Sequence, residues 1–125
     1  MQPDRRITPR VNSDICGEIH MLFGDCIDVQ IVDISASGCQ VVGDERLMSL
    51  RSVATGAPLE FNLNFGLDGC PMHAFCRMIY KRRETQKRCV MGLRWNSIPE
   101  HQLDILQRFV AQRLAANQPQ SSATA

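Results

Sequence analysis

Two arginines near the start of the chain have a spacing that suits an anionic, aromatic ligand. Arg6 and Arg10 are four residues apart, and Pro9 disfavours a helix between them. In an extended segment their side chains project to the same side, roughly 13 Å apart. Guanidinium groups grip phosphate oxygens, pair with the O6/N7 edge of guanine and stack on ring faces. With the neighbouring Arg5, they suit a ligand with two phosphates and flat bases.

A second polar group follows an apolar stretch later in the chain. Asp33, Ser35 and Gly38 form the pattern D-x-S-x-x-G. Asp33 and Ser35 are two residues apart, so their side chains share a face if the segment is a strand. A carboxylate is the natural acceptor for the N1–H and N2–H donors of guanine. Gly38 is expected to adopt a positive φ after the turn and to let a ligand approach the backbone.

Short strands are predicted for most of the chain that would position these two groups. Apolar and polar residues alternate in 59–65 and 89–95, as they do in half-buried strands. Further strands are expected at about 15–23, 26–34, 39–42 and 72–82. Gly24 and Asp25 suit a hairpin turn, and the connection 44–56 has room for one helical turn. Such a series of strands favours an antiparallel barrel or sandwich.

The strand that leads to Asp33 must change its buried face. Ile27, Val29 and Ile31 share their parity with Asp33, so the apolar face would otherwise include a carboxylate. We therefore expect a bend or a β-bulge near Val32, which would turn Asp33 away from the core.

One amphipathic helix is predicted near the C-terminal end, over about 98–115. Ser97 fits an N-cap with Pro99 in the first turn and Glu100 three positions on. Apolar residues then recur at helical spacing: Leu103, Ile105, Leu106, Phe109, Val110 and Leu114. We expect this helix to pack on the strands rather than on a membrane or partner, and residues 117–125 to form a disordered tail.

Composition indicates one soluble domain. The chain has 125 residues, 44% of them hydrophobic, and a net charge of only +1, so bulk charge does not favour a polyanion partner. It has no signal-peptide pattern and no apolar run long enough to cross a bilayer, so we expect a cytoplasmic protein without membrane insertion. The six cysteines match no zinc-binding spacing, and we expect reduced core thiols and no metal.

Each arginine or aspartate pattern is common alone, but their order, spacing and strand context together resemble the PilZ family. In that family R-x-x-x-R followed by [D/N]-x-S-x-x-G defines the cyclic di-GMP site. The segments 38–41, 76–80 and 90–95 and the helix after Pro99 are also similar to PilZ elements, so the resemblance covers about residues 5–115. It implies a six-stranded antiparallel β-barrel at 11–116, closed at one end by the C-terminal helix, with a flexible arm at 1–10 and no fused output domain.

The resemblance also implies a role for each motif residue. Arg6 and Arg10 would clamp guanine bases and phosphates, Asp33 and Ser35 would bond a guanine edge, and Gly38 would shape the turn. An arginine at position 5 is compatible with a stacked pair of ligand molecules. The implied function is a cyclic di-GMP receptor that presents an altered surface to a downstream effector protein.

Two other binding functions are alternatives to a cyclic di-GMP receptor, and an enzyme is not expected. A ligand-independent adaptor with the same fold would need no motif residues. Yet the chain has all five residues of the two motifs, which are Arg6, Arg10, Asp33, Ser35 and Gly38. A single-stranded nucleic-acid binder needs exposed aromatics on a basic face, and only Tyr80 beside 81–83 has such a place, so no DNA or RNA partner is expected. The histidines are scattered and Ser35 lacks the leading glycine of a nucleophile elbow, so we expect neither catalysis nor a cofactor.

Overall fold

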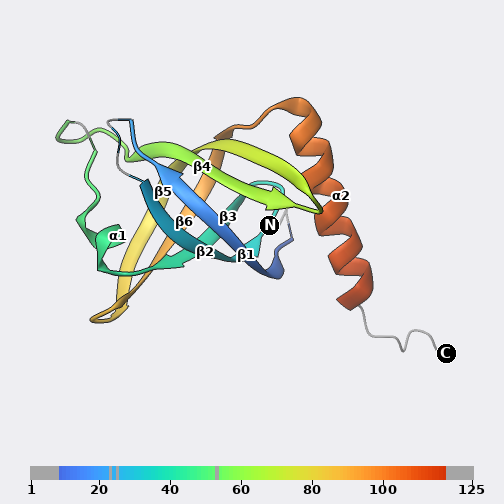
Figure 1. Ribbon diagram of the computed structural model, residues 1–125, viewed down its shortest axis with the longest axis horizontal. Coiled ribbons are helices and arrows are strands. Elements are labelled where there is room, and N and C mark those ends of the chain that lie inside the picture. Colours follow the sequence, from blue (N-terminus) through green and yellow to red (C-terminus); the bar gives the residue numbers. More distant parts are fainter. Residues whose placement is uncertain (1–8, 23, 25, 53, 118–125) are drawn as a thin grey trace, which may run out of the picture.

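The fold is described by a computed structural model for residues 9–22, 24, 26–52 and 54–117. Within these residues six strands and two helices follow one another along the chain (Figure 1). They are β1 (Val11–His20), β2 (Cys26–Ile34), β3 (Gly38–Gly43), α1 (Glu45–Ser49), β4 (Glu60–Leu67), β5 (Cys70–Thr85), β6 (Arg88–Ser97) and α2 (Glu100–Asn117). Most of the predicted arm (1–8) and tail (118–125) lies outside the described residues.

The strands close into one antiparallel barrel in the order β1-β2-β3-β6-β5-β4, with β1 also paired to β4. This confirms the predicted six-stranded barrel. Alternation explains the core, because Phe61, Leu63 and Phe65 of β4 are buried while Asn62 between them is exposed. Closure leaves no unpaired edge strand and fixes the ends of neighbouring strands side by side.

The predicted change of face in β2 is present. Ile27, Val29 and Ile31 are buried, the pairing of β2 with β3 shifts between Ile31 and Asp33, and Ile34 is buried next. An irregularity of this kind turns the side chains beyond it to the other face. Asp33 therefore lies outside the apolar core, and its pair with Gln40 is the last but one before the β2–β3 turn.

Helix α1 provides the expected helical turn in the long connection between β3 and β4. The Asp44 carboxylate accepts the backbone N–H of Arg46 and caps the helix at its start. The ammonium of Lys81 in β5 donates to the carbonyls of Met48 and Leu50 at 3.1 and 3.0 Å, which satisfies the other end.

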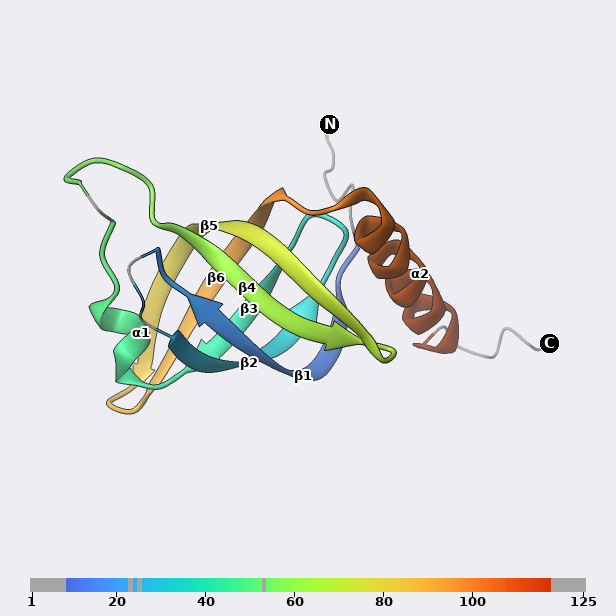
Figure 2. The same ribbon diagram turned by 45° about the horizontal axis from the view of Figure 1, so that its top comes forward.

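Helix α2 lies across one end of the barrel, opposite the end that carries α1 (Figures 1 and 2). Leu106, Phe109 and Val110 are buried in the shared core, as the helical spacing predicted. Gln102 is also buried, and its side-chain oxygen accepts the backbone N–H of His73 in β5 at 2.7 Å. The helix thus closes the barrel through apolar packing and one buried hydrogen bond.

The predicted cap of α2 is wrong. Ser97 belongs to β6, where it pairs with Phe75, and the helix begins at Glu100. The carbonyl of Pro99 accepts the N–H groups of Gln102 and Leu103 instead. Sheet pairing extends β6 by two residues beyond the alternating pattern, and this moves the start of the helix. Neither helix of the described chain has the length and apolar composition required to cross a bilayer.

The cysteines divide into two groups, so the prediction of core thiols holds only in part. Cys39, Cys76 and Cys89 are buried, and burial raises the pKa of Cys76 to about 12. Cys16 and Cys26 are exposed, because they share the outward parity of their strands. Cys70 is partly exposed, and all six thiols are free.

Candidate functional site

The turn between β2 and β3 is held by the hydroxyl of Ser35. This oxygen accepts the backbone N–H groups of Ser37 and Gly38 at 3.1 and 3.2 Å and lies 3.2 Å from the carbonyl oxygen of Gly38, to which it donates. The backbone N–H of Ser35 donates to the same carbonyl at 2.8 Å. Ser35 is buried. Its side chain therefore builds the turn, as serine often does in loops.

Trp95 of β6 anchors this turn from the side. Its indole N–H donates to the carbonyl of Ser35 at 3.1 Å, and its backbone N–H donates to the carbonyl of Ser37 at 3.0 Å. The ring stacks on Phe65 of β4, with centroids 5.9 Å apart and planes 16° apart. The sequence placed Trp95 in the core by its parity, and only the pairing of β3 with β6 shows this second contact.

Gly38 is required for a reason other than the one predicted. Its φ is not among the positive values of the described glycines, so the expected positive φ is wrong. A Cβ at this position would lie 2.0 Å from the carbonyl oxygen of Leu93 and 3.0 Å from Cα of Arg94. Glycine lets β3 approach β6 closely. The space next to Gly38 is therefore filled by backbone of β6.

Asp33 presents an unusual carboxylate beside this turn. Its Oδ1 atom is buried and has no hydrogen-bond partner among the described residues. Burial raises the pKa of Asp33, and the positive charge of Arg10 opposes this rise. A buried acceptor without a donor costs about 1–3 kcal/mol. Asp33 is therefore an acceptor that lacks a donor within the described chain.

Arg10 is brought to Asp33 by the pairing of β1 with β2. It immediately precedes Val11, which pairs with Ile34. Its Nη1 atom lies 3.8 Å from Oδ1 of Asp33, within ion-pair range but too long for a hydrogen bond. Its side chain is 60% exposed, against 17% for Asp33. The described part of the predicted site thus has an exposed guanidinium beside a mostly buried carboxylate. Arg5 and Arg6 lie outside the described residues.

Helix α2 adds a neighbour to this end of the barrel. The guanidinium of Arg113 donates to the carbonyl of Asn12 at 3.1 Å and lies over the ring of Phe109, 4.8 Å from its centroid. Asn12 pairs with Asp33 in the sheet. The second half of α2 therefore contacts the start of β1, next to Arg10.

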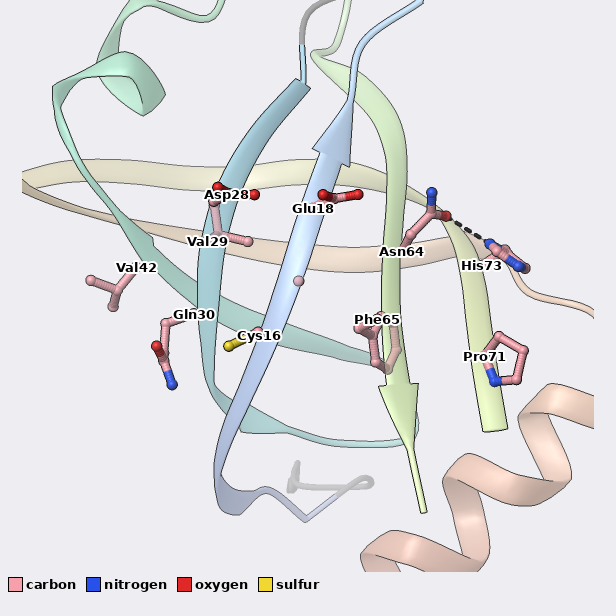
Figure 3. Close-up of a pocket in the computed structure, with 11 residues that line it drawn as sticks. Cys16, Glu18, Asp28, Val29, Gln30, Val42, Asn64, Phe65, Pro71 and His73 are labelled. Atoms are coloured by element: carbon pink, nitrogen blue, oxygen red, sulfur yellow. Dashed lines mark hydrogen bonds between the residues drawn. The ribbon is translucent and has the colours of Figure 1, made fainter. Parts of the chain in front are cut away.

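A separate cleft of about 820 Å³ lies on the outer face of the barrel across β1, β2 and β4 (Figure 3). Glu18, Asp28 and Asn64 line it, and His73 bonds to Asn64 at 2.8 Å. Gly17 also lines it, although a Cβ at Gly17 would meet Ile31 and Leu63 of the core. The cleft includes neither Arg10 nor Asp33, so hollow shape alone does not locate the predicted site.

The chain belongs to the PilZ domain family. The model of that family matches residues 4–112, which include both motifs and nearly the whole barrel. No curated protein matches the chain. The family therefore agrees with the resemblance that the arginine and aspartate motifs suggested.

Solved structures share the fold at low sequence identity. The Bacillus subtilis inhibitor of motility MotI/DgrA matches with a TM-score of 0.75 and 16% identity over 94% of this chain, which spans 55% of that protein. The PilZ domain of Escherichia coli YcgR, solved with c-di-GMP, matches with a TM-score of 0.66 and 12% identity, over 97% of this chain and all of that domain. The PilZ domain of CeSA from a cellulose-synthesizing bacterium matches with a TM-score of 0.58 and 19% identity, over 83% of this chain and 96% of that domain.

Proposed function

We propose that this protein is a receptor for cyclic di-GMP, with Arg10 and Asp33 in direct contact with the ligand. The unpaired Oδ1 atom of Asp33 carries the proposal, because a guanine edge supplies the N–H donors that the described chain does not. Membership of the PilZ family and the c-di-GMP complex of the YcgR domain support it. Arg10 is exposed and close enough to grip a phosphate or a guanine while it keeps its attraction to Asp33.

The other motif residues have different parts in this proposal. Arg5 and Arg6 would add guanidinium groups to phosphates and bases. Ser35 acts as a positioning residue, because its hydroxyl is already engaged with the backbone of the turn. Gly38 likewise acts through structure, since it lets β3 approach β6 next to the turn. This proposal differs from a direct bond between Ser35 and guanine.

Binding would change the surface around the start of β1, and this change is the signal for a partner protein. A dianionic ligand attracts Arg5, Arg6 and Arg10 to the barrel beside Asp33. The start of β1 also contacts α2 through Arg113, so the new surface adjoins an exposed helix. We expect amide hydrogen exchange over residues 1–12 to slow when the ligand saturates the protein. Unchanged exchange there would exclude this mechanism of signalling while leaving binding intact.

Base specificity tests the proposed role of Asp33. Cyclic di-AMP has the same phosphate ring, but adenine lacks the adjacent N1–H and N2–H donors of guanine. We expect cyclic di-GMP to bind at least about tenfold more tightly than cyclic di-AMP, since one charge-assisted bond contributes about 1.5–3 kcal/mol. Calorimetric titration of both ligands measures this ratio.

Equal affinity for the two dinucleotides would contradict contact between Asp33 and guanine. If neither ligand binds, the PilZ fold remains and the ligand-independent adaptor becomes the better account of the function.

A further inference from the structure

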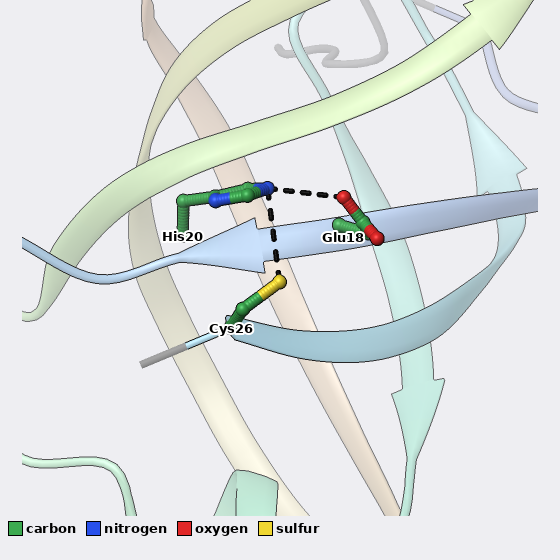
Figure 4. Close-up of side chains that lie close together, drawn as sticks. All are labelled: Glu18, His20 and Cys26. Carbon is green, nitrogen blue, oxygen red and sulfur yellow. Dashed lines mark hydrogen bonds and ion pairs between the residues drawn. The ribbon is translucent and has the colours of Figure 1, made fainter. Parts of the chain in front are cut away.

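The far end of the β1–β2 hairpin brings together side chains that the sequence separates. His20 pairs with Cys26 in the sheet, and Glu18 pairs with Asp28. Residues two apart in a strand share a face, so all four side chains lie on the outer face of the barrel. Figure 4 shows the side chains of Glu18, His20 and Cys26 directed toward one another. The scattered histidines of the sequence thus include one with two possible metal ligands beside it.

The distances between the donor atoms are close to those of a metal coordination shell. Nε2 of His20 lies 3.1 Å from Oε1 of Glu18 and 3.8 Å from Sγ of Cys26. The three donor atoms all lie within 4.8 Å of one another. A tetrahedral zinc ion with bonds of about 2.0–2.3 Å separates its donors by roughly 3.3–3.6 Å. Small rotations of exposed side chains would bring these three donors to that geometry.

The donor set and the local charge both favour a particular class of cation. Sulfur and imidazole ligands suit zinc and similar metals, whereas calcium and magnesium prefer oxygen alone. Glu18 and Asp28 are two carboxylates beside Cys26, and both act on its thiol with negative charge. The nearby guanidinium of Arg46 is paired with Asp44 at 3.1 Å. Arg46 still acts on the Cys26 thiol, but two carboxylates against one guanidinium leave a net negative charge that would attract a divalent cation.

We propose that Glu18, His20 and Cys26 bind a zinc-class divalent cation at the turn end of the β1–β2 hairpin. When the metal–sulfur bond forms, the thiol proton of Cys26 goes to solvent, and no redox step is involved. The fourth position is left for water or for a donor from outside the cluster. Three protein ligands with water in the fourth position are also found in catalytic zinc sites, whereas structural zinc sites have four protein ligands.

This metal site is distinct from the proposed dinucleotide site. Cys26 and Asp33 are at opposite ends of β2, seven residues and therefore roughly 23 Å apart. A cation there would join the two strands where their pairing stops, between His20 and Cys26. We expect it to stabilise the hairpin and to leave the affinity for cyclic di-GMP unchanged. The metal proposal therefore stands or falls independently of the proposed receptor function.

Titration with Co²⁺, followed by displacement with Zn²⁺, tests the site directly. Bound Co²⁺ should give a thiolate charge-transfer absorption and should bind one equivalent per chain. Cys26→Ser should abolish that absorption, and His20→Gln should weaken Zn²⁺ binding by more than about 100-fold, since even the loss of a group that only orients a ligand costs 10–100-fold. Cys16→Ser is the matched control, because Cys16 is an exposed thiol on β1, the strand of Glu18 and His20, and lies outside the cluster. It should bind both metals as wild type does.

Thermal unfolding with and without Zn²⁺ provides the second measurement. Zn²⁺ should raise the Tm of wild type and of Cys16→Ser but not of Cys26→Ser, because only an intact site links the metal to the folded state. Without metal the three proteins should melt alike, since the substituted side chains are exposed. An unaltered Zn²⁺ affinity in Cys26→Ser, or an equal loss in Cys16→Ser, would overturn the proposed site.

Discussion

At the scale of single residues, the side chain of Asp33 has an unfavourable environment among the described residues, and this supports the proposed ligand site. Burial raises its pKa more than the charge of Arg10 lowers it. When the folded pKa of an acid exceeds its unfolded pKa, folding becomes less favourable as pH rises through that interval. The ionised carboxylate of Asp33 therefore reduces the stability of the unliganded protein at neutral pH. A ligand that donates to Oδ1 would remove this cost.

Asp33→Asn should separate binding from stability. The variant loses the ionised carboxylate, so its stability relative to wild type should increase as pH rises from below the unfolded pKa of about 3.9 to neutrality. We expect its affinity for cyclic di-GMP to fall at least about tenfold. Thermal melts at pH 3.5 and about 7, together with calorimetric titration, measure the two effects.

Asp44→Asn is the matched control for this pH dependence, with the opposite sign. The side-chain hydrogen bond of Arg46 lowers the pKa of Asp44, so its carboxylate adds stability above the unfolded pKa that is lost as pH falls. The control should therefore lose stability relative to wild type as pH rises, and it should bind cyclic di-GMP normally. If Asp33→Asn followed the same trend as the control, the assigned environment of Asp33 would be wrong.

At the scale of elements, the β2–β3 turn depends on contacts with β6 as well as on its own sequence. Ser35 builds the turn with its hydroxyl, Trp95 binds two of its carbonyls, and Gly38 permits the close approach of β3 to Leu93. These contacts hold the end of β2, and hence Asp33, in a fixed position. Rigid support of this kind is what a preformed ligand site needs.

Gly38→Ala should destabilise the barrel because the new methyl group would overlap the carbonyl oxygen of Leu93, 2.0 Å away. Separating β3 from β6 should cost about 1–3 kcal/mol or more. Gly66→Ala is the control within β4, since the nearest atom to its Cβ in the described chain would be the carbonyl oxygen of Cys70 at 3.9 Å. Urea unfolding of both variants gives the comparison, and similar midpoints would show that β3 and β6 do not approach as described.

The sequence predicted those features that depend on one strand or helix, and missed those that depend on two. Alternation located the strands, and the parity of Asp33 correctly required the bulge in β2. The φ of Gly38 and the contact of Trp95 depend on how β3 pairs with β6, which periodicity does not define. The juxtaposition of His20 with Cys26 likewise depends on the register of the hairpin. Arg10 and Asp33 were predicted together through the family resemblance, but the unpaired Oδ1 atom was not.

At the scale of the whole molecule, the two proposed sites lie at opposite ends of the barrel. One end carries the β2–β3 turn, the start of β1 and helix α2, and the other carries α1 and the β1–β2 hairpin (Figure 2). The buried apolar residues of all six strands and of α2 form one core between them. A ligand bound beside the β2–β3 turn would therefore contact a rigid barrel. The exposed elements next to that ligand would be α2 and the start of β1.

The contribution of α2 to that rigid body can be measured with Leu106→Ala. Leu106 is fully buried in the core, so its truncation should cost about 2–5 kcal/mol of unfolding free energy. Leu22→Ala is the control, because Leu22 is 76% exposed and its truncation should cost less than about 0.5 kcal/mol. Chemical denaturation measures both, and a small loss in Leu106→Ala would contradict the closure of the barrel by α2.

Calorimetric titration of cyclic di-GMP into wild type, Arg10→Ala and Arg46→Ala tests the central claim most directly. Arg46 is a matched control, because it too is an exposed arginine paired with an aspartate, on the far side of the barrel. We expect micromolar or tighter binding to wild type and Arg46→Ala, and a loss of about tenfold or more in Arg10→Ala. Wild-type affinity in Arg10→Ala, or no binding to wild type, would contradict the receptor site at Arg10 and Asp33.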